Sequence, residues 1–246
     1  MDRRRFLNRV GAVGLSLPAI ASSAWTARQS AADSLRRSGS RSRARSCKII
    51  GIGGAGCNFV VGLASNAVPE GPDMTAEYIC IDLGSGTLPG VDASTGALLD
   101  YSPIKIISLA EFGAGGSVNA ARVAALRKRD QLRTLMAGAA LVFLVAGLGG
   151  GTGSAVAPIL ARLAGEAGAL TVATVITPFE FEGKRNQTAR TTLGYLQREA
   201  DSVVEFSNEK IASMQDESMT MDWLFTMIDL DIAGGIREVW DRLSIL

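Results

Sequence analysis

The chain has 246 residues, 47% of them hydrophobic, and a net charge of +1, which is the composition of a soluble globular protein with one domain of about 200 residues. It contains no histidine, which excludes Ser-His-Asp and Cys-His catalysis and histidine-ligated metal sites. Its three cysteines are odd in number and lack metal-ligand spacing, so we expect buried, inert thiols rather than a disulfide framework.

Positive charge is concentrated in residues 1–46, where ten arginines face two aspartates and give a net charge of +8. Paired arginines, an apolar stretch at 10–20 and small residues after it predict a twin-arginine export signal at 1–27. That stretch is too short for a stable membrane span. The alternatives are a disordered basic extension and a wrongly assigned start. The protein is periplasmic if the signal is used and cytoplasmic otherwise. Residues 28–46 are predicted to be a disordered Arg/Ser-rich linker.

Residues 47–246 carry a net charge of −7, which argues against a nucleic-acid partner. Apolar strands here alternate with helical segments. A long loop is predicted at 84–103, between the second and third strands. The predicted strands are 48–52, 77–82, 104–107, 141–146, 170–177 and 202–206. The predicted helices are 57–67, 118–137, 155–165, 184–200 and one from about 221 to the C-terminus. This pattern predicts an α/β fold, a Rossmann-like, mostly parallel sheet with helices on both faces.

Three glycine-rich segments follow predicted strands, at 51–56, 112–117 and 147–154, and the last reads Gly-Leu-Gly-Gly-Gly-Thr-Gly-Ser. Glycine lets the backbone come close to a charged ligand, and a loop that opens a helix presents N–H groups to phosphate oxygens. The carboxyl ends of parallel strands share one edge, so we expect the three segments to converge there. None of them contains lysine. Charge neutralisation is therefore expected from backbone N–H groups, helix dipoles and a bound cation.

A second hypothesis rests on the first of these segments. Residues 51–56 satisfy G-x-G-x-x-G, and Asp82 ends the next predicted strand, which is the pattern of a Rossmann-type NAD or FAD oxidoreductase. This hypothesis leaves the segments 147–154 and 177–183 unexplained. A third hypothesis is a degenerate scaffold that binds no nucleotide and serves interaction alone.

A set of motifs in fixed order carries a family resemblance. They are Gly-Gly-Ala-Gly-Cys-Asn at 53–58, Gly-Ala-Gly-Gly at 113–116, Gly-Gly-Gly-Thr-Gly-Ser at 149–154, Thr-Pro-Phe-Glu-Phe-Glu-Gly at 177–183, Ser-Asn-Glu-Lys at 207–210 and a helix bearing Asp229. Together they resemble the GTP-binding domain of the tubulin/FtsZ family, on its bacterial FtsZ side. The resemblance covers residues 47–246 and implies GTP or GDP, with Mg²⁺, as the ligand.

The resemblance also implies roles for individual residues. Those that would wrap the α- and β-phosphates are Gly53, Gly54, Ala55, Cys57, Asn58, Gly149, Gly150, Gly151, Thr152, Gly153 and Ser154. Gly115 and Gly116 would sit over the γ-phosphate, and Glu182 would bind the ribose. Asn208 and Asp229 would hydrogen-bond the guanine edge, which offers a pair of donors that adenine lacks. It assigns no catalytic residue and no protein metal ligand within this chain.

Two departures from the family pattern concern the phosphates. Asp82-Leu83-Gly84 stands where Asn-Thr-Asp is usual, and Asn186 stands where an arginine is usual, with Arg185 one residue earlier. One lost charge-assisted phosphate contact costs about 1.5–3 kcal/mol.

A third departure concerns hydrolysis. In the family, an acidic loop beyond the helix of Asp229 activates water in a neighbouring subunit's site, and a second domain follows. We therefore expect an FtsZ-like domain truncated before both, with weak or absent hydrolysis. Its expected partner is a full-length homologue or a second copy, whose filaments it would cap or modulate.

Overall fold

The computed structural model describes residues 45–64, 74–84, 104–110, 115–209, 226, 229–230 and 232–237. The predicted export signal lies outside the described residues, as does the predicted linker except for residues 45 and 46, which open the first strand. Residues 85–103 of the predicted loop and most of the predicted final helix also lie outside them. In the described part of the chain, no helix has both the length and the apolar character that crossing a membrane requires.

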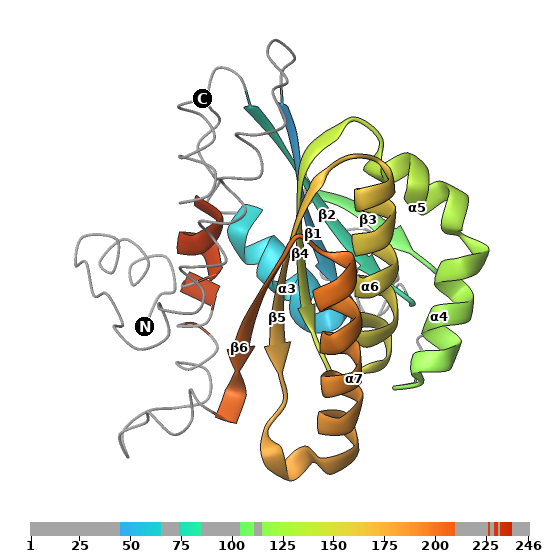
Figure 1. The fold of residues 1–246 in the computed structure, drawn as a ribbon, viewed down its shortest axis with the longest axis vertical. Coiled ribbons are helices and arrows are strands. Elements are labelled where there is room, and N and C mark those ends of the chain that lie inside the picture. The colour runs from blue at the N-terminus through green and yellow to red at the C-terminus, as the bar shows by residue number, and fades with distance from the viewer. Residues whose placement is uncertain are drawn as a thin grey trace, which may run out of the picture.

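Within the described residues, six strands form one sheet in which every neighbouring pair is parallel (Figure 1). They are β1 (Arg45–Ile52), β2 (Met74–Asp82), β3 (Ile104–Ser108), β4 (Ala139–Gly147), β5 (Leu170–Thr177) and β6 (Ser202–Ser207). Their spatial order is β3-β2-β1-β4-β5-β6. The chain therefore winds outward in both directions from β1 and β4, and ligands of such sheets bind where the order reverses. The predicted α/β class is confirmed.

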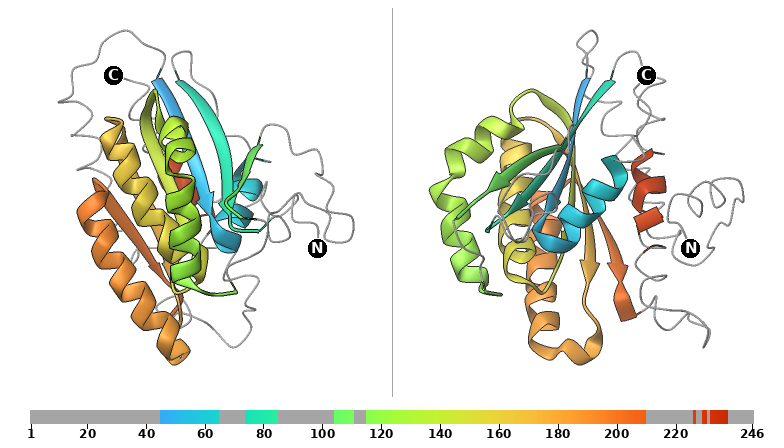
Figure 2. Two further views of the ribbon diagram at one scale, coloured as in Figure 1. Left: turned by 90° about the vertical axis from the view of Figure 1, so that its right-hand side faces the viewer. Right: turned by 180° about the vertical axis from the view of Figure 1, so that it is seen from behind.

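Helices cover both faces of the sheet. One face carries α3 (Gly53–Ala64) and the helical residues 232–237, and the left view of Figure 2 shows α4, α5, α6 and α7 on the other. These are α4 (Val118–Arg127), α5 (Arg129–Met136), α6 (Gly151–Glu166) and α7 (Gly183–Glu199). Side chains of β1 alternate between the faces, with Ile49 packed toward α3 and Ile50 toward α6. Both isoleucines are fully buried, as the central strand of a two-sided sheet requires.

The predicted helix at 118–137 is wrong, because the structure contains two helices that meet at Lys128. The Lys128 backbone (φ −102°, ψ 18°) leaves helical geometry, and its N–H is shared between the carbonyls of Ala124 and Ala125. Its ammonium donates to the carbonyl of Ser108 at 2.7 Å, at the end of β3. A tertiary contact therefore sets the break.

Two helices begin earlier than predicted. The structure starts α3 at Gly53, four residues before the predicted start, and α6 at Gly151, also four residues early. Residues that the sequence places in loops thus form the first turns of both helices. Their N–H groups lack intrahelical acceptors, because a helix leaves its first four donors free.

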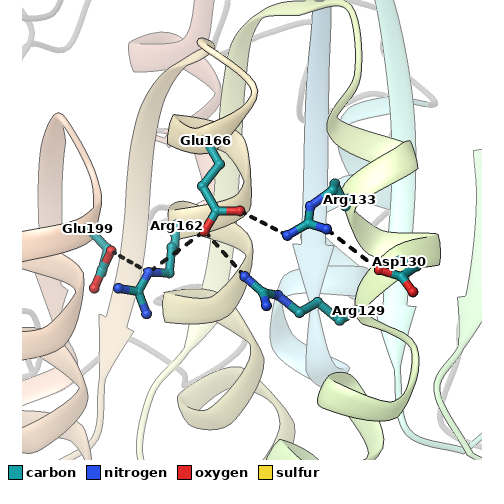
Figure 3. Close-up of polar contacts among 6 residues, drawn as sticks. All are labelled: Arg129, Asp130, Arg133, Arg162, Glu166 and Glu199. Carbon is teal, nitrogen blue, oxygen red and sulfur yellow. Dashed lines mark hydrogen bonds and ion pairs between the residues drawn. The ribbon is translucent and has the colours of Figure 1, made fainter.

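An exposed ion network joins α5, α6 and α7 (Figure 3). Glu166, the last residue of α6, pairs with Arg129 and Arg133 at 3.3 Å each and with Arg162 at 3.9 Å. Arg162 also pairs with Glu199 at 3.7 Å, and Arg133 pairs with Asp130 at 3.6 Å. The network lies at the far end of the 16-residue α6, roughly 24 Å from its glycine-rich first turn. It serves helix packing rather than a ligand at that turn, and exposed pairs stabilise only weakly.

Candidate functional site

The first turns of α3 and α6 touch each other at the carboxyl edge of the sheet. A Cβ on Gly53 would lie 3.3 Å from the backbone nitrogen of Gly153 and 3.5 Å from Cβ of Thr152. The two helices follow β1 and β4, the adjacent strands between which the order reverses. Each N-terminus carries about +0.5 of an elementary charge, so the pair forms one electropositive patch of free N–H groups.

Close packing explains two of the glycines in these turns. A Cβ on Gly56 would lie 2.1 Å from the carbonyl oxygen of Val145 in β4, and one on Gly153 would lie 2.2 Å from that of Gly147. No side chain can occupy either position without moving a helix away from the sheet. These glycines bring the helix starts against the strand backbone.

Two other glycines face open space. A Cβ on Gly54 or on Gly150 would meet nothing within 4 Å, and Gly150 has ordinary extended backbone geometry (φ −87°, ψ 176°). Gly54 is exposed, as are Ala55 and Asn58 in the same helix. The bare backbone at these points is accessible to an anion.

The hydroxyl groups of α6 are engaged inside the protein. Thr152 Oγ1 donates to Asp82 Oδ1 at 2.7 Å, and Ser154 Oγ accepts from the N–H of Gly149 at 2.8 Å. Thr152 and Ser154 are both buried. Gly151, which precedes Thr152 in the chain, is also buried. Both hydroxyl groups of this turn therefore already have partners inside the protein.

The side chain of Cys57 faces the core. It is fully buried and donates to the carbonyl of Gly51 at 3.4 Å. Its contact with the Cys80 thiol, together with burial, raises the pKa of the Cys57 thiol and keeps it neutral. Burial likewise raises the pKa of the Cys47 thiol. All three cysteines are buried and free, which confirms the expectation of inert thiols.

Asp82 does not have the position that the oxidoreductase hypothesis requires. Its Oδ1 accepts from Thr152 and from the N–H of Leu83, both at 2.7 Å, and the residue is only 5% exposed. The carboxylate thus faces the start of α6 instead of standing open for a ribose. Sequence reasoning missed the contact with Thr152, because the two residues lie 70 positions apart.

The segment between β5 and α7 closes around the backbone of Phe179. The N–H of Phe179 donates to Glu182 Oε1 at 3.0 Å, and Asn186 Nδ2 donates to the Phe179 carbonyl at 2.8 Å. The other oxygen of Glu182 pairs with Arg185. A Cβ on Gly149 would lie 2.8 Å from the carbonyl oxygen of Arg185. The backbone of Arg185, which lies between Glu182 and Asn186 in the chain, therefore borders Gly149.

Asn208 follows β6 at the same edge of the sheet. It is 9% exposed, and its Oδ1 is buried and accepts no hydrogen bond from the residues that the structure describes. Its neighbour Glu209 accepts from the N–H of Glu180 at 3.0 Å, which joins this strand end to the segment after β5. An orphaned buried acceptor costs about 1–3 kcal/mol, which a donor from a ligand would recover. Sequence reasoning assigned no role to Glu209, although it stands in the motif at 207–210.

Gly115, Gly116 and Asp229 come from segments outside the two helix starts. Gly115 and Gly116 are exposed, with φ of 55° and 81°, and lead into Ser117, the N-cap of α4. Residues 112–114 of the predicted second glycine segment lie outside the described residues. Asp229 is partly exposed and precedes Ile232, which packs on the α3 face of the sheet.

Comparison with known proteins identifies the arrangement. The model of the tubulin/FtsZ family, GTPase domain, matches residues 46–216. The cell division protein FtsZ of Pseudomonas aeruginosa is 37% identical over 198 residues, which are 80% of this chain and 48% of that protein. The FtsZ of Pseudomonas putida is 35% identical over 198 residues, 80% of this chain and 47% of that protein. The chain thus spans about half the length of these relatives.

Solved structures of the family have a similar fold. An empty FtsZ dimer from M. jannaschii has a TM-score of 0.63 and 26% identity, over 83% of this chain and 57% of that one. CetZ from Methanosaeta thermophila shares the fold, with a TM-score of 0.61 and 17% identity over 77% of this chain and 52% of that one. With most of its length matched by the family model, the chain belongs to the tubulin/FtsZ family.

Proposed function

We propose that this domain binds a guanine nucleotide, GTP or GDP with Mg²⁺, at the edge where α3 and α6 begin. The observation that carries the proposal is the contact between Gly53 and Gly153, which joins two free helix N-termini into one anion-binding surface. The backbone N–H groups at 53–58 and 149–154 would hold the α- and β-phosphates. Gly115 and Gly116 would lie over the γ-phosphate.

The base and the sugar would lie along the strand ends beyond β4. Glu182 would accept from the ribose hydroxyls, since each of its oxygens has one described partner and keeps a second lone pair. Asn186 would contribute to the ribose site indirectly, because its side chain donates a hydrogen bond to the Phe179 carbonyl and so orients the segment that carries Glu182. Asn208 and Asp229 would take the guanine edge. The Oδ1 of Asn208, which has no hydrogen-bond partner among the residues that the structure describes, supports this assignment.

Titration with GTP and with ATP tests the proposal. We expect GTP to bind at least about tenfold more tightly, because guanine supplies N–H donors to Asn208 and Asp229 that adenine lacks. Asn208→Leu is expected to weaken GTP binding by about 5- to 100-fold, the range of one buried hydrogen bond, without lowering stability. Asn208→Asp keeps the acceptor and is the matched control. Equal affinity for the two nucleotides refutes guanine recognition, and no shift with any nucleotide supports the degenerate scaffold.

The finer parts of the proposal are weak intrinsic hydrolysis and an effect on filaments. Both rest on the resemblance, in which a loop beyond the helix of Asp229 activates water. We expect a polypeptide of these 246 residues to release phosphate slowly and to shorten or cap filaments of a full-length homologue. Phosphate release at the rate of a full-length relative would contradict this part. The names of the relatives make cell division the process in which we propose that it acts.

A further inference from the structure

The solvent face of α4 has an apolar centre with an arginine on each side. Val123 and Leu126 are 49% and 51% exposed, and their spacing of three residues makes them neighbours on the helix. Arg122 and Arg127 flank this pair and are also exposed, and we call the four residues the α4 surface. In the described part of the chain, neither arginine has an ion pair or a hydrogen bond through its side chain. Two uncompensated positive charges thus stand beside an apolar pair that is open to solvent.

Positive charge predominates around the α4 surface. Residues 118–129 contain four basic residues and no acidic one. The two basic residues outside the α4 surface have partners, because Lys128 donates to the carbonyl of Ser108 and Arg129 pairs with Glu166. The charge that this segment leaves without a partner is therefore that of the two arginines in the α4 surface.

The opposite charge pattern follows β6. Residues 199–209 contain four acidic residues and no basic one. Asp201, just before the strand, and Glu205, within it, are exposed, and Val203 between them in the sequence is partly buried. These three residues are the β6 surface. Each of its carboxylates accepts one hydrogen bond from β5, and neither has a cation partner among the residues that the structure describes. The β6 surface thus repeats the pattern of the α4 surface with the charges reversed.

The two surfaces lie at opposite sides of the domain (Figure 1). The strands β3 and β6 are the two ends of the described sheet, and Lys128, the residue after α4, is bonded to the end of β3. A second copy placed beside the first can therefore bring its negative side against the positive side of the first. Such a head-to-tail contact leaves one surface free on each outer copy, so it can repeat along a row of copies.

We propose that the α4 surface docks against the β6 surface of a second copy of this chain, so that the domains associate side by side. Opposite charges then flank an apolar centre on both partners, and the charges set the register of the contact. The inference goes beyond nucleotide binding and does not rest on it, because no residue of either surface is assigned to the nucleotide. Exposed ion pairs are weak and screened by salt, so the contact is expected to be weak and to depend on ionic strength.

Sedimentation velocity of the full chain, without nucleotide and at about 20 mM salt, tests the contact by charge reversal. Arg122→Glu with Arg127→Glu is expected to weaken self-association at least about tenfold, because like charges then face each other. Asp201→Asn with Glu205→Lys is expected to do the same, and the asparagine keeps an acceptor for the hydrogen bond from β5. A mixture of the two variants should associate within about threefold of the wild type, since each reversed surface then meets its complement. Failure of the mixture to associate, with both variants folded by circular dichroism, overturns the proposal.

Two competing explanations give different results. Residues 1–46 carry a net charge of +8, and if they supplied the positive partner, the α4 variant would associate as the wild type does, which refutes the proposal. Lys184→Glu with Arg198→Glu, on exposed residues of α7, changes the net charge by the same amount and is expected to leave association intact. An equal loss in this control would mean that net charge alone matters. A wild type that stays monomeric at every concentration refutes the contact and leaves the nucleotide site standing.

Discussion

Alanine at position 56 is expected to lower the free energy of unfolding by about 3 kcal/mol, the upper end of the range for overpacking. The added Cβ would lie 2.1 Å from the carbonyl oxygen of Val145, and that oxygen belongs to the central strand β4. Neither atom is the far end of a flexible side chain, so α3 must move away from the sheet. Urea unfolding followed by circular dichroism measures the change.

Gly62 supplies the control within the same helix. A Cβ there would meet nothing within 4 Å, so Gly62→Ala is expected to raise stability by about 0.5–1 kcal/mol through its helix propensity. The two substitutions should therefore change the free energy of unfolding in opposite directions, while its slope against urea concentration stays the same. A Gly56→Ala variant as stable as the wild type would mean that α3 does not begin against β4 as described.

Aspartate at position 150 is expected to weaken GTP binding at least about 100-fold and to leave the domain as stable as before or slightly more stable. Gly150 is the N-cap of α6, where aspartate is a favoured residue, and a Cβ at this position meets open space. The added carboxylate would occupy the surface proposed for the phosphates. Thermal unfolding and GTP titration of the same preparation measure the two effects.

Gly150→Asn is the matched variant, since it has the same shape and caps a helix equally well but carries no charge. We expect it to retain much more affinity for GTP than Gly150→Asp does. Equal affinity of the wild type and Gly150→Asp would place the phosphates elsewhere.

The strands and their order of appearance were predictable, because apolar, β-branched runs bounded by glycine have few alternatives. The strand β5 was predicted with the bounds that the structure gives, Leu170–Thr177. Helix starts were less predictable. Glycine is a poor helix former, so sequence rules place Gly53 and Gly151 in loops. The two helix starts depend on the packing of Gly56 and Gly153 against strand carbonyls, which only the folded chain brings near.

The candidate site was likewise predictable in part, in its location but not in its hydrogen bonds. Its location at the strand ends follows from the parallel sheet, and the sequence placed Gly53, Thr152 and Asn208 there. The hydrogen bonds that decide what each group can offer were not predictable. The bond between Thr152 and Asp82 and the bond between Glu180 and Glu209 join residues 70 and 29 positions apart. Nothing local distinguishes these partners from other polar residues.

Amide hydrogen exchange with and without GTP tests the nucleotide site most directly. The first-turn N–H groups of α3 and α6 have no intrahelical acceptor, so we expect them to exchange faster in the free domain than the N–H groups further along each helix. We predict that GTP slows exchange at 53–58 and 149–154 together, by about tenfold or more, and that ATP at the same concentration slows it much less. Unchanged exchange in both segments at saturating GTP, or protection confined to other parts of the chain, would contradict a guanine nucleotide held between the two helix starts.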